Sequence, residues 1–273
     1  MSIVDRAIAK IQKAESLALR YQDFGFHLAF SGGKDSLAIY HLSKMAGVKF
    51  RPVMQVTTID PPELMKFVRK NYPDVIMERP DINFYELIVK KRILPTRVAR
   101  YCCQYLKEQS GAGAVVMLGI RKAESNKRAK RSELEVANKF SNTLDQFNID
   151  TESKTVCIKG KDKIMFSPII DWTDSDVWRF IRDNNIEYCS LYDKGYHRIG
   201  CILCPMSSVK SRRLDCANYP GVVKKVKESI EELMNDGQYN NFEGDVDAVF
   251  DWWISNDSAR SFLARKLQYK FEL

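Results

Sequence analysis

The sequence predicts an α/β protein with an open, parallel, twisted sheet and helices on both faces, followed by a helical C-terminal region. Short apolar runs alternate with segments whose apolar residues recur at helical spacing, a pattern typical of β-α-β units. The runs are apolar nearly throughout, which indicates strands buried on both faces of a parallel sheet. The length of 273 residues accommodates one large α/β domain or two small ones.

The predicted elements follow one another in a regular order. Strands are predicted over residues 26–30, 52–56, 75–77 and 114–118, and an ordered apolar segment returns at 164–170. Helices are predicted over residues 2–22, 35–45 and 62–68, and from a cap at Thr173 or Asp174 onward. Residues 1–205 therefore form the predicted α/β domain, with a polar flap at about 121–163, and residues 206–273 form a helical extension.

The composition excludes several classes of protein. Hydrophobic residues make up 45% of the chain, and 14 Phe, 12 Tyr and 4 Trp supply a core, which excludes a mainly disordered chain. No window approaches the roughly 18 consecutive apolar residues of a membrane span. The first residues lack the charged-then-apolar order of a secretion signal. We therefore expect a cytoplasmic protein that does not associate with membranes.

The chain is basic, with 43 Lys and Arg against 35 Asp and Glu, a net charge of +8. Such an excess favours a polyanionic partner such as a nucleotide, tRNA or DNA. A solvated face is the alternative interpretation of any basic run. The basic residues concentrate in two runs: Arg121, Lys122, Lys127, Arg128, Lys130 and Arg131, and then Lys210, Arg212, Arg213, Lys224, Lys225 and Lys227.

A glycine loop lies between the first predicted strand and the first helix after it. It reads Ser31-Gly32-Gly33-Lys34-Asp35-Ser36. Two glycines allow close backbone approach, and successive N–H groups at a helix start form an anion cradle. Lys34 adds a positive charge, the two serine hydroxyls can donate to phosphate oxygens, and Asp35 can cap the helix or orient Mg²⁺. The spacing differs from G-x-x-x-x-G-K-[ST], which disfavours a γ-phosphate-cleaving NTPase.

Seven cysteines are too few for a disulfide scaffold of this length, so clustered thiols favour metal binding or catalysis. Four of them form two pairs, Cys102-Cys103 and Cys201-x-x-Cys204, which we call the cysteine group. Two pairs suggest a four-thiolate site, and their spacing does not choose between zinc and an iron–sulfur cluster. The alternative is that adjacent cysteines are small buried hydrophobes.

The glycine loop resembles the PP-loop of the N-type ATP pyrophosphatases, which include GMP synthetase, tRNA thiolation enzymes and the phosphoadenosine phosphosulfate (PAPS) reductases. The resemblance implies an adenine nucleotide alpha-hydrolase-like fold and an ATP-binding loop, with Lys34 and Asp35 catalytic and Mg²⁺ accompanying ATP. It also implies that ATP is cleaved between its α- and β-phosphates: a substrate oxygen attacks the α-phosphorus and pyrophosphate leaves. The loop then holds the pyrophosphate and neutralises its growing charge.

Other segments resemble the cluster-containing sulfonucleotide reductases of the same superfamily. Residues 100–107 and 192–204, which contain the cysteine group, are similar to segments that bind one [4Fe–4S] cluster in those proteins. Lys107 follows Cys103 by four residues, so on a helix it would lie near such a cluster. Residues 119–125 look like the family's G-x-R-x-x-E-S segment, which implies nucleotide contacts from Gly119 and Arg121 and a catalytic role for Arg121. Cys157, Cys189 and Cys216 match no family position and are interpreted as structural.

Two departures from the reductases favour ATP over PAPS. No cysteine follows Cys216, although those reductases carry a nucleophilic cysteine near the C-terminus. The glycine loop has the full form found in ATP-using members. An intact loop with a cluster site resembles the ATP-pyrophosphatase component of DNA phosphorothioation. The leading hypothesis is thus adenylylation of a DNA or tRNA acceptor followed by sulfur transfer.

That resemblance also implies a sulfur donor protein such as a cysteine desulfurase, and a homodimer is an expected assembly. Two alternatives stay open at this point. The first is a sulfonucleotide reductase that lacks its own tail cysteine and borrows a thiol from a partner. The second is a zinc-containing nucleic-acid-binding module with a degenerate nucleotide site.

Overall fold

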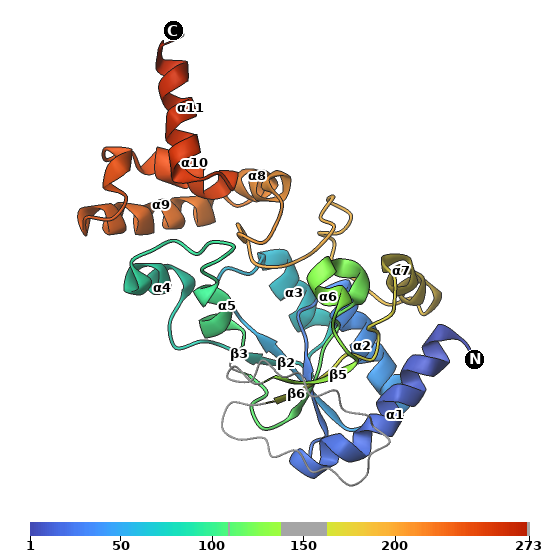
Figure 1. Cartoon of the computed structure of the whole chain (residues 1–273). Coiled ribbons are helices and arrows are strands. Elements are labelled where there is room, and N and C mark those ends of the chain that lie inside the picture. Colours follow the sequence, from blue (N-terminus) through green and yellow to red (C-terminus); the bar gives the residue numbers. More distant parts are fainter. Residues whose placement is uncertain (109, 138–162, 272–273) are drawn as a thin grey trace. The chain divides into compact units, whose positions relative to one another are not determined.

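The protein is described by a computed structural model over residues 1–108, 110–137 and 163–271 (Figure 1). The chain divides into two compact units that are each assembled from separate segments. The first unit comprises Met1–Gln55, Pro62–Glu78 and Gln109–Ile199, and the second comprises Val56–Pro61, Arg79–Glu108 and Gly200–Leu273. Within the described residues, no helix is both long and apolar enough to cross a membrane.

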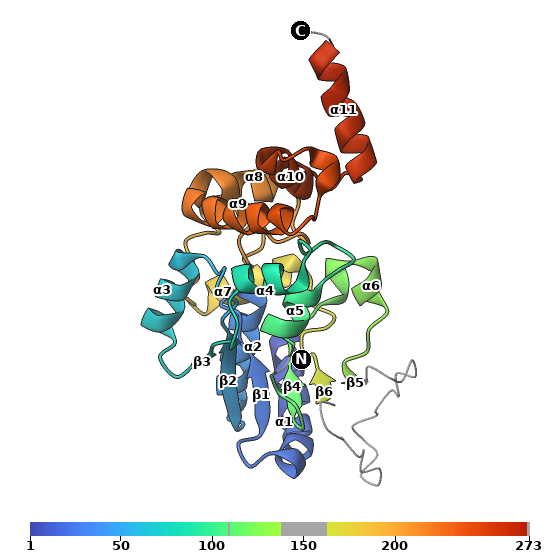
Figure 2. The same cartoon turned by 90° about the vertical axis from the view of Figure 1, so that its left-hand side faces the viewer.

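The first unit contains a single six-stranded sheet. Its strands are β1 (Phe26–Ala29), β2 (Phe50–Gln55), β3 (Ile76–Glu78), β4 (Val115–Met117), β5 (Leu134–Ala137) and β6 (Lys163–Phe166). Their order across the sheet is β3-β2-β1-β4-β6-β5, which can be followed from side to side in Figure 2. All neighbouring pairs are parallel except β5 and β6, which are antiparallel. The predicted α/β class with a mostly parallel sheet is confirmed.

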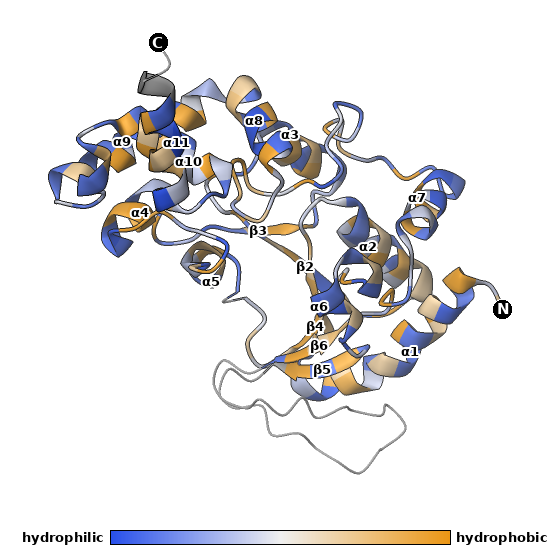
Figure 3. Cartoon of the chain, turned by 45° about the horizontal axis from the view of Figure 1, so that its top comes forward, coloured by the Kyte–Doolittle hydropathy of each residue, from blue (hydrophilic) through white to orange (hydrophobic). Residues whose placement is uncertain are grey.

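The strands form where the sequence is apolar. Figure 3 shows most of the sheet in the colours of hydrophobic residues, whereas the helices carry both colours. Phe26 of β1 stacks on Phe166 of β6, with ring centroids 5.7 Å apart, and both side chains are fully buried. Such burial on both faces explains why β1 and β4, at the centre of the sheet, lack the alternation of apolar and polar residues.

Helices of the first unit begin at sequence-encoded caps. Ser2 and Asp5 form a capping box for α1 (Ile3–Tyr21), and Thr173 and Asp176 form one for α7 (Asp174–Asp183). Thr173 is therefore the cap of that helix, the first of the two predicted candidates. The remaining helices of this unit are α2 (Lys34–Ala46), α3 (Pro62–Asn71), η1 (Lys122–Glu124) and α6 (Asn126–Ala129).

The direction of chain travel across the sheet reverses at β1. The chain moves from β1 to β2 and β3 on one side, and then places β4 on the other side of β1. In open α/β sheets, ligands bind at such a reversal, beyond the carboxyl ends of the strands. The glycine loop follows β1 and Gly119 follows β4, so both candidate segments lie at this edge.

The second unit is helical. It contains α4 (Phe84–Lys91), α5 (Tyr101–Leu106), α8 (Val209–Asn218), α9 (Pro220–Asn235), η2 (Asn240–Phe242), α10 (Val246–Ser255) and α11 (Ala259–Phe271). One residue separates the end of α8 from Pro220, which starts α9, and Gly237 follows the C-cap of α9. Its core joins α4 to α9 and α10 through fully buried side chains that include Leu87, Ile230 and Val249.

Part of the predicted polar flap has regular structure. Residues 122–137 form η1, α6 and the edge strand β5, which the sequence does not predict. The rest of the flap, residues 138–162, lies outside the described residues, as does the predicted structural Cys157. Cys189 is buried and Cys216 is partly buried, and neither forms a disulfide.

Candidate functional site

The glycine loop turns sharply between β1 and α2. Gly32 adopts a left-handed backbone with φ of +68°, and a Cβ there would lie 2.6 Å from Cδ1 of Leu64. The two serines brace the turn: the Ser36 hydroxyl donates to the Gly33 carbonyl over 2.8 Å, and the Ser31 and Ser36 hydroxyls lie 3.2 Å apart. The loop therefore needs glycine at position 32 and closes through its own serines.

The first N–H group of α2 already has a partner. The Lys34 backbone N–H donates to the hydroxyl of Tyr192 over 2.8 Å. Tyr192 is held in place by edge-on ring contacts with Trp178 and Tyr188. Burial raises the pKa of the Tyr192 hydroxyl, so it stays protonated while it accepts this hydrogen bond.

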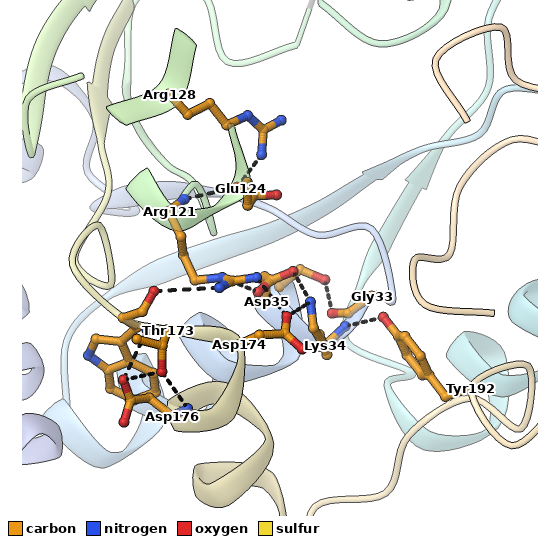
Figure 4. A network of polar contacts seen from close by, with 12 residues as sticks. Gly33, Lys34, Asp35, Arg121, Glu124, Arg128, Thr173, Asp174, Asp176 and Tyr192 are labelled. Carbon is orange, nitrogen blue, oxygen red and sulfur yellow. Dashed lines mark hydrogen bonds and ion pairs between the residues drawn. The ribbon is translucent and has the colours of Figure 1, made fainter. Parts of the chain in front are cut away.

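Two cations and two carboxylates form a closed network beside the loop (Figure 4). The Lys34 ammonium lies 3.0 Å from Oδ2 of Asp35 and 3.0 Å from Oδ1 of Asp174. The Arg121 guanidinium donates from Nε to Oδ1 of Asp35 over 2.7 Å and from Nη2 to Oδ1 of Asp174 over 3.0 Å. Each cation thus contacts both carboxylates, and the four charges cancel.

The cations of this network are buried and one carboxylate is not. The side chains of Lys34 and Arg121 are 6% and 4% exposed, whereas that of Asp174 is 63% exposed. Partial burial opposes ionisation of Asp174, but hydrogen bonds and charges from Lys34 and Arg121 outweigh it and lower its pKa. Asp174 is therefore ionised near neutral pH and reaches the network from the solvent side.

Gly119 brings the end of β4 against the start of α2. A Cβ at this position would lie 2.8 Å from the carbonyl carbon of Asp35 and 2.9 Å from its oxygen. Because those atoms are backbone, only glycine permits this approach. The contact places Arg121, two residues later, in reach of Asp35.

The predicted nucleotide residues are all in the first unit and meet at one place. Arg121, predicted from its position after the fourth strand, is joined directly to Asp35 of the loop. The sequence reasoning missed Asp174 and Tyr192 as site residues. Asp174 was interpreted as a helix start and Tyr192 only as part of a cysteine segment, and no local signal distinguishes their contacts with the loop.

The cysteine group lies entirely within the second unit. Cys102 and Cys103 begin α5, and Cys201 and Cys204 flank the short turn before α8. The Cys102 thiol donates to Cys103, which raises the pKa of Cys102, and the charges of Cys103, Cys201 and Cys204 raise it further. The four thiols are thus within electrostatic reach of one another. No three His, Cys, Asp or Glu side chains among the described residues are arranged as ligands of one metal ion.

Lys107 lies one helical turn after Cys103, as predicted. It is the C-cap of α5, and its backbone N–H donates to the Cys103 carbonyl over 2.9 Å. Its pKa is raised, mainly by the charge of Cys201 and further by Asp60 and Cys103. The ammonium is therefore electrostatically coupled to the thiols.

A second cation near the cysteines is fully buried. Arg212 of α8 is 1% exposed and donates from Nη1 to the Trp253 carbonyl over 3.3 Å. Its Nε and Nη2 atoms have no hydrogen-bond partner among the described residues. Burial lowers its pKa, and the charge of Cys204 is among those that act against this. The interpretation of Arg212 as part of an exposed basic run is wrong, because its guanidinium lies in the core.

Most basic side chains of the first run are engaged in ion pairs within the protein. Lys122 pairs with Asp171 over 2.7 Å, Arg128 pairs with Glu124, and Arg131 pairs with Glu135 over 2.6 Å. Arg121 belongs to the network at the loop. Lys127 and Lys130 are the exposed members of this run for which the described residues give no ion pair.

Comparison with known proteins identifies one family. The phosphoadenosine phosphosulfate reductase domain matches residues 25–207, which include the glycine loop, Arg121, Asp174 and the cysteine group. Among solved structures, a phosphoadenylyl-sulfate reductase from Candida auris in a phosphate complex has a TM-score of 0.46 at 16% identity. That match covers 72% of this chain and 93% of the other chain.

Individual relatives carry different names. A probable FAD synthase of Schizosaccharomyces pombe is 28% identical over 207 residues, 70% of this chain and 67% of that protein. An adenosine 5'-phosphosulfate reductase of Oceanobacillus iheyensis is 31% identical over 150 residues, 52% of this chain and 54% of that protein. An uncharacterised protein of Methanocaldococcus jannaschii is 29% identical over 196 residues, which are 67% of this chain but 42% of the relative.

Proposed function

Because the chain belongs to the phosphoadenosine phosphosulfate reductase domain family, we propose that it is an ATP pyrophosphatase that adenylylates an acceptor and releases pyrophosphate. Members of this family are enzymes that bind adenine nucleotides, and relatives include a reductase and a probable FAD synthase. The observation that carries the proposal is the pair of buried cations, Lys34 and Arg121, beside the full glycine loop.

The arrangement of the loop suits a departing pyrophosphate. An acceptor oxygen attacks the α-phosphorus of ATP, the bond from that phosphorus to the bridging oxygen breaks, and its electron pair leaves with pyrophosphate. Lys34 and Arg121 would neutralise this growing charge from a largely water-free position, where their effect is strong. Asp35 lies between them and would orient the Mg²⁺ that accompanies ATP.

We also propose that the cysteine group binds an anionic thiolate-held centre, which would require its four thiols to come closer together than they lie in this structure. Two N–H groups of the buried Arg212 lack partners, and Lys107 adds a second positive charge close to the thiols. The buried carboxylate of Asp215 compensates part of this charge, and a four-thiolate centre with net negative charge would add to that compensation. Cys102, Cys103, Cys201 and Cys204 would hold a [4Fe–4S] cluster, which when bound could supply electrons or sulfur for the reaction.

The proposed acceptor is a nucleic acid, DNA or tRNA. After adenylylation, the proposed donor, a cysteine desulfurase, would supply sulfur as a persulfide. A dithiol reductant would reduce the outer sulfur by two electrons to hydrosulfide and become a disulfide, and the hydrosulfide would displace AMP and leave a thiolated acceptor. The exposed Lys127 and Lys130 of the first unit, and Lys210 and Arg213 of the second, are the basic residues that support this part of the proposal. Phosphate contacts from them would make binding weaken steeply as salt rises.

ATP–pyrophosphate exchange tests the proposal. Anaerobically prepared protein with tRNA or DNA should incorporate labelled pyrophosphate into ATP, and Lys34→Ala should reduce the rate at least a hundredfold. Lys122→Ala is the matched control, because Lys122 lies near Arg121 in sequence but pairs with Asp171 outside the network; it should leave the rate unchanged. No exchange with any acceptor would refute the pyrophosphatase proposal.

Two alternatives give different results in related assays. The reductase-named relative favours a second candidate, a sulfonucleotide reductase with a borrowed thiol. Sulfite release from PAPS in the presence of thioredoxin would identify it. Metal content separates the third: about four irons per chain fit the proposed cluster, whereas one zinc would fit a nucleic-acid-binding module.

A further inference from the structure

The two cations at the glycine loop are neutralised before any ligand arrives. Asp35 and Asp174 each contact both Lys34 and Arg121, and the two cationic side chains are 6% and 4% exposed. A buried charge without a partner is strongly unfavourable, so these cations need an anion at all times. A bound phosphate and one of the two carboxylates therefore compete for the same N–H groups.

We infer that Asp174 is an internal stand-in for the ligand, which pyrophosphate or the outer phosphates of a triphosphate displace from Lys34 and Arg121. This inference rests on the proposed function and adds a residue that sets affinity and product release. Asp174 acts through the two cations and touches neither ligand nor reacting atoms, so it is a positioning residue.

Exposure and location distinguish Asp174 from Asp35. The Asp35 side chain is 23% exposed and sits in the first turn of α2, where it is part of the loop itself. The Asp174 side chain is 63% exposed and starts a different helix, α7. Ion pairs of an exposed carboxylate contribute little stability, so a ligand with several charges displaces Asp174 more easily than Asp35.

Tyr192 accepts a hydrogen bond from another donor of the loop, the Lys34 backbone N–H. The Tyr192 hydroxyl oxygen lies 2.8 Å from this nitrogen. This N–H lies at the N-terminal end of α2, where an anion would otherwise bind. A neutral hydroxyl is a weaker acceptor for this N–H than a charged phosphate oxygen. Besides Asp35 of the loop itself, the Asp174 carboxylate and the Tyr192 hydroxyl contact these donors, and both residues lie C-terminal to β6.

Calorimetric titration of inorganic pyrophosphate with Mg²⁺ tests the inference. Asp174→Asn keeps the size of the side chain but removes the competing charge, so it should bind pyrophosphate about five- to tenfold more tightly than the unmodified protein. Asp171→Asn is the matched control. Asp171 is 60% exposed in the same segment but pairs with Lys122 instead, and its replacement should leave the affinity unchanged.

Whether the pyrophosphate affinity of Asp174→Asn rises or falls decides which role Asp174 has. A residue that merely supports the site would weaken binding when changed, whereas a competitor strengthens it. In the exchange assay, Asp174→Asn should lower the KM for ATP and also lower kcat, because pyrophosphate leaves more slowly.

The possible failures are distinguishable. If the unmodified protein binds pyrophosphate and Asp174→Asn binds it equally or less tightly, the inference is overturned while the proposed function stands. If neither protein binds it, the nucleotide role of the loop falls and the inference falls with it. If Asp174→Asn alone binds, the stand-in role is supported.

Discussion

Buried cations in the two units are compensated in opposite ways. In the first unit, Lys34 and Arg121 each contact two carboxylates, so the loop is electrically closed without a ligand. In the second unit, the fully buried Arg212 makes one hydrogen bond to a carbonyl and leaves two nitrogen atoms without partners among the described residues. The first arrangement is compatible with a ligand that binds reversibly, and the second is compatible with a permanently bound group.

This contrast follows from how mobile each compensating anion is. Asp174 reaches its cations from solvent and can withdraw at small cost. Arg212 is buried and does not deprotonate in proteins, so its charge needs compensation inside the unit. The two settings are compatible with the proposed exchangeable ligand in the first unit and the proposed thiolate-bound centre in the second.

Gly119→Ala should give the largest effect, because it disrupts the closed arrangement of the first unit. The added Cβ would meet backbone atoms of Asp35 at 2.8 and 2.9 Å, so α2 or β4 must shift. We expect a loss of about 2 kcal/mol in the free energy of unfolding and a more than tenfold loss of pyrophosphate affinity. Urea unfolding and calorimetry measure the two effects.

Gly221→Ala is the control for that change, since a Cβ there would have no neighbour within 4 Å. It lies in the first turn of α9, where alanine is a better helix former than glycine. Equal stability of the two variants would contradict the close approach of Gly119 to Asp35.

Arg212→Met tests the unmatched charge of the second unit. Removal of a positive charge near Cys204 should raise the dissociation constant for zinc at the cysteine group about tenfold. A chromophoric chelator in competition with the reduced, iron-free protein measures this constant. Arg213→Met, at the exposed neighbouring position, should leave it unchanged, and equal effects of the two variants would remove the proposed role of Arg212.

The smallest expected effect is the pH dependence of stability that His27 causes. Unlike Lys34 and Arg121 of the same unit, this buried side chain can lose its proton and become neutral. Burial lowers the pKa of His27 to about 4, against the opposing charge of Glu78 and with help from Arg51 and Lys163. Because the unfolded chain binds a proton near pH 6.5 and the folded one does not, stability falls as pH drops from 6.5 toward 4. Between pH 7 and 5.5 this group should cost about 1 kcal/mol.

Urea unfolding at several pH values checks the prediction for His27. His27→Gln should flatten the dependence in this window, whereas His197→Gln, at an exposed position, should keep the slope of the unmodified protein. Burial also lowers the pKa of His41, so part of the slope should remain in His27→Gln; a slope that His27→Gln leaves unchanged would assign the proton uptake to another group.

Local patterns predicted the parts of the molecule that depend on local physics. The apolar runs at 26–30 and 114–118 contain β1 and β4, and the runs at 52–56 and 75–77 overlap β2 and β3. The apolar character of β1 and β4 follows from burial on both faces of the sheet. The glycine loop was predicted with its neighbours, since Gly32 requires a left-handed backbone. In contrast, β5 is a four-residue edge strand that contains a glutamate, too short and polar to stand out.

Contacts between distant segments could not be predicted. Asp174 meets Arg121 from 53 residues away, and Tyr192 meets Lys34 from 158 residues away. The local sequence around Asp174 is that of an ordinary helix start. The sequence around Tyr192 does not distinguish it from other aromatic residues. Arg212 was misinterpreted for the same reason: charge along the chain does not reveal that α8 turns this side chain into the core.

The position of Tyr192 has a practical consequence. Its ring meets Trp178 at nearly a right angle, with centroids 4.9 Å apart, while its hydroxyl rests on the loop. Any anion that takes the Lys34 N–H must loosen the tyrosine and so alter the surroundings of the indole. If the proposed ligand binds, the tryptophan fluorescence of the protein should change on its addition, and Trp178→Phe should remove that change while the other three tryptophans remain.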